Sequence, residues 1–274
     1  MKQCGVSVTR SCKCIGLSKA TYYRPARDWR IADEPVIDAL NDVLAKSLRS
    51  GFWKCFHRIR QQSHPFNHKR VYRVYCMMGL NLPRRIKRKL PKRVPKPLTV
   101  IDQPNRQCAL EFTARREAND SLYCGRAFRT LNVIDEGTRE CLSIEADTSL
   151  PASRVVQALE RLQDQRGLPD QIRCDNGTEL TSSAFVEWCN KHNIELAYIR
   201  PGKPQQNGFA ERFNGSFRRQ FFNAYLFENL TQVRDMAWAY QQDFNNHRSH
   251  ESLGNIPPSV YRQQLENSNL ELSH

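Results

Sequence analysis

Residues 128–145 read FRTLNVIDEGTRECLSIE, and their pattern sets the architecture of the larger part of the chain. Segments 128–134 and 141–145 are rich in β-branched and apolar residues, and the polar turn between them contains Gly137, which is typical of a β-hairpin. Strand and helix patterns then alternate: helix 151–166, strand 171–174, helix 182–192, strand 194–199, helix 205–222 and helix 230–246. A strand pair followed by such alternation predicts an α/β domain with a mixed sheet.

The first 83 residues predict a small all-α region. Ser18 is a candidate N-cap for a short helix that Pro25 ends, and the turn at Gly16 lies before it, an order typical of a helix-turn-helix. Further helices are expected at 36–49, 51–62 and 68–80. Their aromatic residues are expected to fill a small core, and the interleaved Lys and Arg are candidates for phosphate contacts.

The positive charge is concentrated in the first third of the chain. The 274 residues carry 42 Lys and Arg against 28 Asp and Glu, a formal net charge of +14. Residues 1–100 hold 23 of those cations and only 5 of the acids, so the rest of the chain is slightly acidic. This asymmetry favours a basic module for a polyanion, joined to a module with a different task; a solvated basic face without a partner is the alternative.

Composition also disfavours several classes of protein. No apolar run reaches about 18 residues, which excludes a helical membrane span, and the polar N-terminus lacks the apolar segment of a secretion signal. The ten cysteines are scattered without a CxxC pair, so we expect reduced cytosolic thiols. The same lack of paired spacing disfavours zinc. The zinc candidates are His57, His64, His68, Cys55 and Cys76.

A basic, proline-containing segment predicts a linker between two domains. Residues 84–97 read RRIKRKLPKRVPKP, with eight Lys or Arg and three prolines. Proline blocks helix formation, so this segment is expected to be extended and to follow a phosphate backbone or remain in solvent. Its candidate DNA contacts are Arg84, Arg85, Lys87, Arg88, Lys89, Lys92 and Arg93. We place the linker at 84–104, after a helical region at 1–83.

Two carboxylates have positions that suit chemistry. Asp175 follows a short predicted strand, where α/β sheets expose functional groups. Glu211 lies on the 205–222 helix, whose apolar stripe is Phe209, Phe213, Phe217 and Phe221. Helical spacing places Asn207, Glu211, Asn214 and Arg218 together on another face. The alternatives are a solvated Glu on an amphipathic helix and an Asp-Asn-Gly sequence that only makes a turn.

The two carboxylates together resemble a known signature. Asp175 and Glu211 are separated by 35 residues, which is similar to the Asp-Asp-Glu pattern of retroviral integrases and insertion-sequence transposases. Other segments resemble the OrfB-type subunit of two-frame bacterial insertion elements. They are 51–54, 67–71, 125–135, 138–140, 175–179, 201–207, 211–214 and 250–254, with Pro258 and Tyr261 beyond them. The resemblance covers nearly the whole chain.

The resemblance implies a fold, an activity and partners. It implies a ribonuclease-H-like integrase catalytic core at 105–224, a C-terminal helical extension at 225–274, and metal-dependent cleavage and transfer of DNA strands. Three carboxylates would hold two Mg²⁺ or Mn²⁺ ions. The partners would be duplex DNA (terminal repeats and target), an OrfA-type upstream-frame protein and further copies of the chain, in the bacterial cytoplasm with the nucleoid and without a membrane. Lys203, Asn207 and Arg218 are further candidate DNA contacts.

The first carboxylate departs from the family pattern. Glu111 stands where the family has an Asp, the expected tryptophan is missing, and several extra residues precede Gly125. An ungapped match leftward from Gly125 places Arg116 there instead. Asp120 and Asp135 are fallback ligands, although Asp135 resembles a separate Asp of the family. A Glu in place of Asp adds about 1.3–1.5 Å of reach, and a displacement of about 1 Å can cost ~10²-fold in rate.

Three functions therefore stay open. The first is an active transposase or integrase subunit with Asp175, Glu211 and Glu111 as catalytic residues and metal ligands. The second is a catalytically impaired DNA-binding remnant, suggested by the altered strand around Glu111. The third is a ribonuclease-H-type nuclease without strand transfer, which would have no need of the basic helical region.

Overall fold

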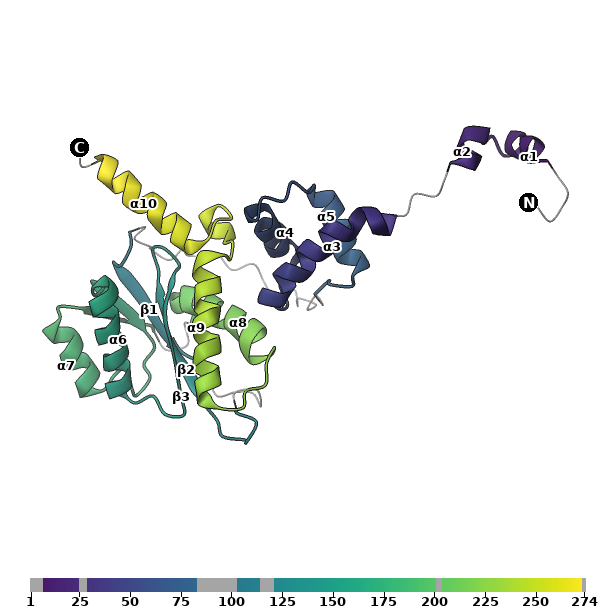
Figure 1. Ribbon diagram of the computed structural model, residues 1–274. Helices are drawn as coiled ribbons and strands as arrows, with labels where there is room; N and C mark the ends of the chain where they lie inside the picture. The colour runs from purple at the N-terminus through teal and green to yellow at the C-terminus, as the bar shows by residue number, and fades with distance from the viewer. Residues whose placement is uncertain (1–6, 25–28, 83–102, 114–120, 201–203, 273–274) are drawn as a thin grey trace.

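The computed structural model describes residues 7–24, 29–82, 103–113, 121–200 and 204–272. The N-terminal third is helical, as the sequence predicts (Figure 1). Its helices are α1 (Val8–Cys14), α2 (Lys19–Tyr23), α3 (Trp29–Lys46), α4 (Phe52–Gln61) and α5 (His68–Met77). The Ser18 hydroxyl accepts a hydrogen bond from the Thr21 amide at 3.1 Å and so caps α2.

Helix α3 begins seven residues before the expected start at residue 36. Pro35 lies inside it. Proline lacks the amide hydrogen, so the helix continues through this position without one backbone hydrogen bond. Asp33, which is 1% exposed, holds α5 by ion pairs to Arg70 and Arg73 at 3.1 and 2.8 Å. The core of α3–α5 comprises Val36, Ala39, Leu40, Val43, Cys55, Ile59, Val71, Val74 and Tyr75.

A five-stranded mixed sheet forms the second part of the chain. Its strands are β1 (Gln107–Phe112), β2 (Arg129–Asp135), β3 (Cys141–Asp147), β4 (Gln171–Cys174) and β5 (Glu195–Tyr198), in the order β3-β2-β1-β4-β5. The β1–β2 and β2–β3 pairs are antiparallel, whereas β1–β4 and β4–β5 are parallel. This arrangement confirms the α/β, ribonuclease-H-like class with a mixed sheet and a preceding helical region.

Helices cover both faces of the sheet (Figure 1). On one side lie α6 (Ala152–Arg166) and α7 (Ser183–Lys191), and on the other α8 (Gly208–Phe217) and α9 (Leu230–Asn246). Side chains alternate across β1 because successive residues of a strand point to opposite faces. Cys108 and Leu110 therefore join the core under α6 and α7, while Ala109 and Glu111 point toward α8.

The region expected as one helix at 205–222 consists of three helical elements of different type. A 3₁₀ turn at Pro204–Asn207 leads into α8, and a π-helical turn, Arg218–Phe222, follows it. Phe213, Phe217 and Phe221 are buried in one cluster with α9, as expected. Phe209 is not in that cluster: it lies in the first turn of α8, with the Arg139 guanidinium 3.8 Å from its ring centre. The apolar stripe thus has three phenylalanines rather than four.

The C-terminal segments pack on the same side as α8. Phe244 and Ala237 of α9 belong to the cluster that contains Phe213. A 3₁₀ turn at Glu251–Leu253 follows α9, and α10 (Pro258–Leu272) is held by an ion pair between Arg262 and Glu140 at 3.3 Å. Among the described helices, none has the length and apolar character needed to cross a bilayer.

Candidate catalytic site

The pairing of β1 with β4 positions two of the predicted carboxylates. Gln107 pairs with Gln171, and Ala109 pairs with Arg173 in parallel register. Continued by two residues, the same register brings Glu111 opposite Asp175, just beyond the end of β4. Paired residues of neighbouring strands point to the same face, so both carboxylates point toward α8. Glu111, rather than Arg116, therefore occupies the strand position beside Asp175; Arg116 and Asp120 lie outside the described residues.

Asp175 is oriented by the turn that follows it. Its Oδ1 accepts a hydrogen bond from the Gly177 amide at 3.0 Å, an Asx turn. A Cβ on residue 177 would lie 3.0 Å from that oxygen, which is tighter than most real Cβ contacts, so the carboxylate would have to shift by a few tenths of an ångström. The Asn176 amide donates to the Ile199 carbonyl at 2.8 Å and fixes the turn to the residue after β5. The Asp-Asn-Gly sequence is thus a turn that also aims a carboxylate.

Helix α8 presents Glu211 between two amides that reach β1. The Asn207 side chain, 1% exposed, donates to the Leu110 carbonyl at 3.2 Å and to Glu111 Oε2 at 3.4 Å. Asn214 hydrogen-bonds to Glu111 and accepts from Asn132 Nδ2 at 2.5 Å. Glu211 lies between Asn207 and Asn214 on the same face of the helix and is exposed. This is the face that the helical spacing predicts.

The carboxylates act on one another electrostatically. The pKa of Glu111 is raised to about 8, first by burial and then by the negative charges of Glu211 and Asp175, while the hydrogen bond from Asn214 opposes the shift. Carboxylates that are brought together disfavour their common ionisation unless a cation is bound. The three side chains are therefore near enough to interact, although they come from three different elements.

The donor atoms here suit a hard divalent cation. Carboxylate and amide oxygens are what Mg²⁺ and Mn²⁺ prefer. The buried Oδ1 atoms of Asn207 and Asn132 have no hydrogen-bond partner among the described residues, which leaves oxygen acceptors free at this face. In the described part of the chain, no three His, Cys, Asp or Glu side chains converge closely enough to hold one ion as they stand. A metal ion held here would require these side chains to rotate.

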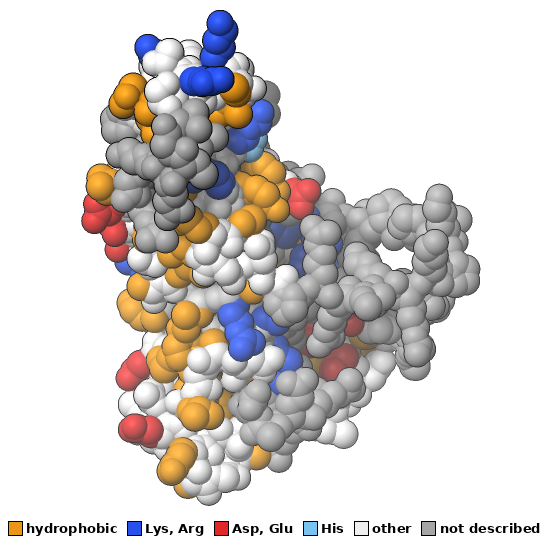
Figure 2. Space-filling model, turned by 90° about the vertical axis from the view of Figure 1, so that its right-hand side faces the viewer, with side chains coloured by type: hydrophobic (Ala, Val, Ile, Leu, Met, Phe, Trp, Pro, Cys, Tyr) orange, Lys and Arg blue, Asp and Glu red, His pale blue; other side chains and the backbone are white. Residues whose placement is uncertain are grey.

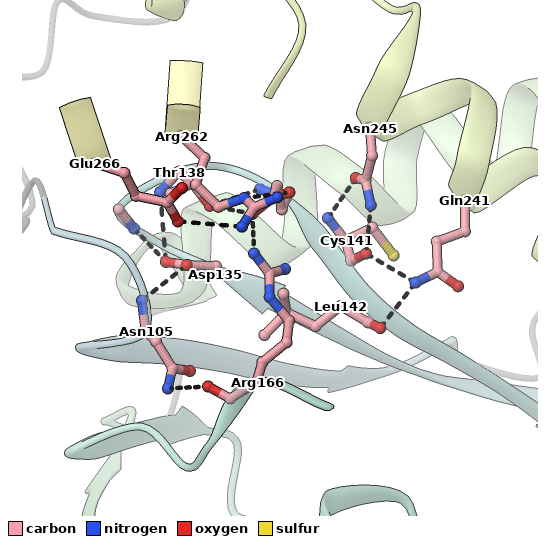
Figure 3. Close-up of polar contacts among 12 residues, drawn as sticks. Asn105, Asp135, Thr138, Cys141, Leu142, Arg166, Gln241, Asn245, Arg262 and Glu266 are labelled. Carbon is pink, nitrogen blue, oxygen red and sulfur yellow. Dashed lines mark hydrogen bonds and ion pairs between the residues drawn. The ribbon is translucent and has the colours of Figure 1, made fainter. Parts of the chain in front are cut away.

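The fallback ligand Asp135 has a different task. It pairs with Cys108, so it points to the opposite face from Glu111. Its oxygens accept from the backbone amides of Asn105 at 3.0 Å and Gly137 at 2.8 Å (Figure 3). With 1% of its surface exposed, it organises the turn between β2 and β3. This position belongs to the hairpin and not to the carboxylate face.

The other predicted site residues are distributed as follows. Arg84, Arg85, Lys87, Arg88, Lys89, Lys92, Arg93 and Lys203 lie outside the described residues. Arg218 lies 5.3 Å from the ring centre of Phe222, in the π-helical turn. Asn207, predicted as a DNA contact, is buried and hydrogen-bonded to Glu111. Of the zinc candidates, Cys55 is fully buried in the helical core and His68 stacks on Trp53.

Sequence reasoning missed Arg173, Glu136 and Asn132. Arg173 lies two residues before Asp175 and donates to the Gln206 carbonyl at 3.1 Å, in the 3₁₀ turn that precedes α8. It also pairs with the fully buried Glu136 at 3.1 Å. Burial raises the pKa of Glu136 to about 7, although Arg173 lowers it. The period-2 alternation of β4 gives Arg173 and Asp175 the same face, and that signal could have found Arg173.

Comparison with known proteins gives the family. The integrase core domain family matches residues 102–204, and a second integrase core domain family matches residues 192–258. The chain is 33% identical over 267 residues to "Insertion element IS476 uncharacterized 39.2 kDa protein" of Xanthomonas euvesicatoria, with 96% of this chain and 75% of that protein covered. It is 32% identical to "Insertion element IS407 uncharacterized 31.7 kDa protein" of Burkholderia multivorans, with 93% and 90% covered.

The fold comparison agrees. The chain resembles a protein in the cryoEM structure of the simian T-cell lymphotropic virus intasome in complex with PP2A regulatory subunit B56 gamma. The TM-score is 0.52 at 15% identity, over 75% of this chain and 70% of that one, a likeness of fold. The chain belongs to the bacterial insertion-element transposases that carry an integrase core domain, and the activity of that family is DNA transposition.

Proposed function

We propose that this chain catalyses the divalent-metal-dependent cleavage of its element's DNA ends and their transfer into target DNA. The observation that carries the proposal is the parallel register of β1 and β4, which brings Glu111 beside Asp175 on the face covered by α8. Glu211 is presented over the same face by a helix whose Asn207 is hydrogen-bonded to Glu111. Three carboxylates on one face are the group that such phosphoryl transfer needs.

Asp175, Glu211 and Glu111 are the residues that would hold Mg²⁺ or Mn²⁺. Two such bound ions supply Lewis-acid chemistry for an in-line displacement at phosphorus. The chain's own contribution is orientation: Asn207 and Asn214 hold the Glu111 carboxyl, and the Asp175–Gly177 turn holds the second carboxyl. The Arg173–Gln206 hydrogen bond ties the strand that carries Asp175 to the turn that begins α8.

The distribution of positive charge along the chain supports the proposed partners. Terminal-repeat and target duplexes are polyanions, and the chain's cations are concentrated in residues 1–100. Lys and Arg side chains gather at the top of the molecule and again near its middle on the face in Figure 2. We assign duplex DNA to the helical region, to the linker arginines and lysines, and to Lys203 and Arg218. Assembly of several copies on DNA and an OrfA-type partner complete the proposal.

A catalytically impaired DNA-binding protein is the second candidate. The observation that favours it is the longer Glu111 side chain, together with the lack of three converged ligands in the described part of the chain. The joining of DNA ends in an assay distinguishes the two candidates. An impaired protein binds the element's ends without joining them, and Glu111→Asp then raises the rate of joining.

A strand-transfer assay with oligonucleotides of the element's terminal repeats tests the proposal. In Mg²⁺ or Mn²⁺ the wild-type chain, with its upstream-frame partner, should join these ends to a target duplex. Asp175→Asn, Glu211→Gln and Glu111→Gln should each lower the rate by more than about 100-fold, because each removes a ligand. Glu160→Gln is the matched control, since Glu160 is exposed on α6 at the other face of the sheet.

Two results would contradict the assignment. Full activity in Glu111→Gln would remove Glu111 from the site, and it would mean that the first ligand lies elsewhere in the chain. Absence of joining by the wild-type protein with either metal, while end binding persists, would favour the DNA-binding candidate.

A further inference from the structure

A cavity of about 330 Å³ lies where the N-terminal helices meet the integrase core. One wall comes from α4, which contributes Lys54. The others come from the turn after β2, from α8 and from the segment after α9. The cavity faces the side of α8 opposite to Glu211: Phe209, Arg212 and Ser216 line it, whereas Asn207, Glu211 and Asn214 point the other way. It is therefore separate from the carboxylate site.

Basic side chains dominate the lining of this cavity. They are Lys54, Arg139, Arg212, Arg248 and His250. Among the described residues that line it, Glu251 is the only acidic one, and it is exposed. Three guanidinium groups and the Lys54 amine lie around this small volume, and their positive charges repel one another more strongly where protein excludes water, although Glu136 offsets part of the charge of Arg139. An anion in the cavity would relieve this repulsion.

Arg248 is buried and His250 is half-buried, and each has a buried hydrogen-bonding atom without a partner among the described residues. Arg248 is 8% exposed, and its Nη1 donates to Tyr240 at 3.1 Å and to Gln220, which fixes the guanidinium in place. Its Nε, and Nε2 of His250, have no hydrogen-bond partner among the described residues. A buried guanidinium Nε–H without a partner is uncommon, and it leaves a donor that a bound anion can use. The hydroxyls of Ser216, Ser249 and Ser252 add further donors to the lining.

The electrostatics of the lining agree with an anion site. The pKa of Lys54 is lowered to about 7, by burial first and then by the positive charges of Arg248 and Arg219. The pKa of His250 is lowered to about 3, by burial and by Arg248, Lys54, Arg139 and Arg212. Burial is the larger cause of both pKa shifts, and the neighbouring positive charges add to it, so a further proton is disfavoured in this cavity.

We propose that this cavity binds a phosphate group. Arginine forks and serine hydroxyls match the oxygens of phosphate, and Phe209, Phe213 and Phe244 form apolar walls that strengthen each charged contact. The group can come from a DNA backbone or from a free phosphate-bearing molecule, which share this chemistry. The inference is independent of the catalytic proposal because it uses none of the three carboxylates.

Titration of the full chain with inorganic phosphate tests the proposal, in a calorimeter and against sodium chloride of equal ionic strength. Phosphate should bind the wild-type chain, and Arg212→Gln and Lys54→Gln should each weaken binding by about 10-fold or more, since each removes a charge-assisted contact. Arg212 is exposed and Lys54 is repelled by its neighbours, so neither variant should unfold. Arg60→Gln is the matched control: it removes the same charge from an exposed position of α4 that does not line the cavity.

A second measurement reports on Lys54 itself. Bound phosphate raises the proton affinity of a neighbouring amine, so binding at pH 7 should take up protons. Phosphate itself also titrates near pH 7, so the slope of the observed enthalpy against the ionisation enthalpy of the buffer should differ between Lys54→Gln and the wild-type chain, by the proton that Lys54 takes up, and should be the same in Arg60→Gln as in the wild type. Equal phosphate affinity in wild type, Arg212→Gln and Lys54→Gln would overturn the proposal, as would the absence of any phosphate binding beyond the chloride control.

A short duplex oligonucleotide distinguishes the source of the phosphate. If the duplex displaces inorganic phosphate from the wild-type chain, the cavity holds a DNA backbone phosphate. If phosphate still binds with unchanged affinity in the presence of saturating duplex, the ligand is a free phosphate-bearing molecule. Both results support the site, and strand-transfer activity does not enter either one, so failure of the catalytic proposal would leave this inference testable.

Discussion

Arg58 of α4 and Asp243 of α9 form an ion pair, with 2.6 Å between Nη2 and Oδ1. The Arg58 side chain is 9% exposed and that of Asp243 is 21% exposed. The pair joins the helical region to the integrase core at the level of the phosphate cavity, because Lys54 lies one helical turn before Arg58.

Loss of this pair should destabilise the protein. Asp243→Asn leaves a nearly buried guanidinium without its counter-charge, which should lower the free energy of unfolding by about 1–3 kcal/mol. Urea denaturation of the full chain measures it. Asp235→Asn, an exposed position on the same helix, should change stability by less than about 0.5 kcal/mol. A double-mutant cycle with Arg58→Met that shows no coupling would mean that the pair contributes nothing in solution.

Glu111 should make the stability of the metal-free protein depend on pH. Its folded-state pKa of about 8 lies above the usual value of 4.5, so folding favours the protonated form. The resulting stabilisation is complete below about pH 4.5 and is lost as the pH rises through 8. The free energy of unfolding should therefore fall between these values in EDTA, and less steeply in Glu111→Gln. Glu136 contributes in the same direction, so the difference between variant and wild type is the quantity to compare. Identical slopes would show that Glu111 is not in this environment.

Divalent metal should stabilise the folded chain. A ligand that binds only the folded state adds RT ln(1 + [L]/Kd), which is about 2.7 kcal/mol at 100 times Kd. Melting curves with Mn²⁺ and after EDTA should differ accordingly. Asp175→Asn and Glu211→Gln should remove most of that gain without unfolding the protein. Should Glu111→Gln keep the full gain, the metal does not use Glu111.

Gly177 is a position where one methyl group should affect activity more than stability. A Cβ there would lie 3.0 Å from Asp175 Oδ1, so Gly177→Ala should shift that carboxylate by a few tenths of an ångström. We expect about 10- to 100-fold slower strand transfer with a melting temperature near that of the wild type. Gly215→Ala in α8 is the control: the nearest atom to its Cβ is 3.9 Å away, and alanine favours a helix. Unchanged transfer by Gly177→Ala would mean that the turn does not aim Asp175.

Local patterns predicted much of this fold. The strand pair, the α/β alternation and the face of α8 that carries Glu211 follow from periodicities of two and of about 3.6 residues, which depend only on backbone geometry. The ends of elements were less predictable. The π-helical turn Arg218–Phe222 and the 3₁₀ turn before α8 depend on packing against β1 and α9, and the sequence of the segment alone does not contain that information.

The residues of the candidate site also divide into those that local patterns predicted and those whose position depends on distant parts of the chain. The pattern singled out Asp175 and Glu211, whereas the position of Glu111 depended on its register with β4, sixty residues away. Arg173 went unnoticed because its partners, Glu136 and the Gln206 carbonyl, come from two distant turns. The sequence alone does not predict the phosphate cavity, because Lys54 and Arg248 are nearly two hundred residues apart and only the folded chain brings them together.

The order of the three carboxylates along the chain, with Glu111 on β1, Asp175 after β4 and Glu211 on α8, determines when the proposed site can form during synthesis. During synthesis β1 leaves the ribosome long before β4, and Glu211 follows later still. A growing chain therefore has no full set of carboxylates until α8 has emerged. If the chain acts as proposed, a product that is aborted earlier would retain the basic helices but lack Glu211, and it would bind DNA without cutting it.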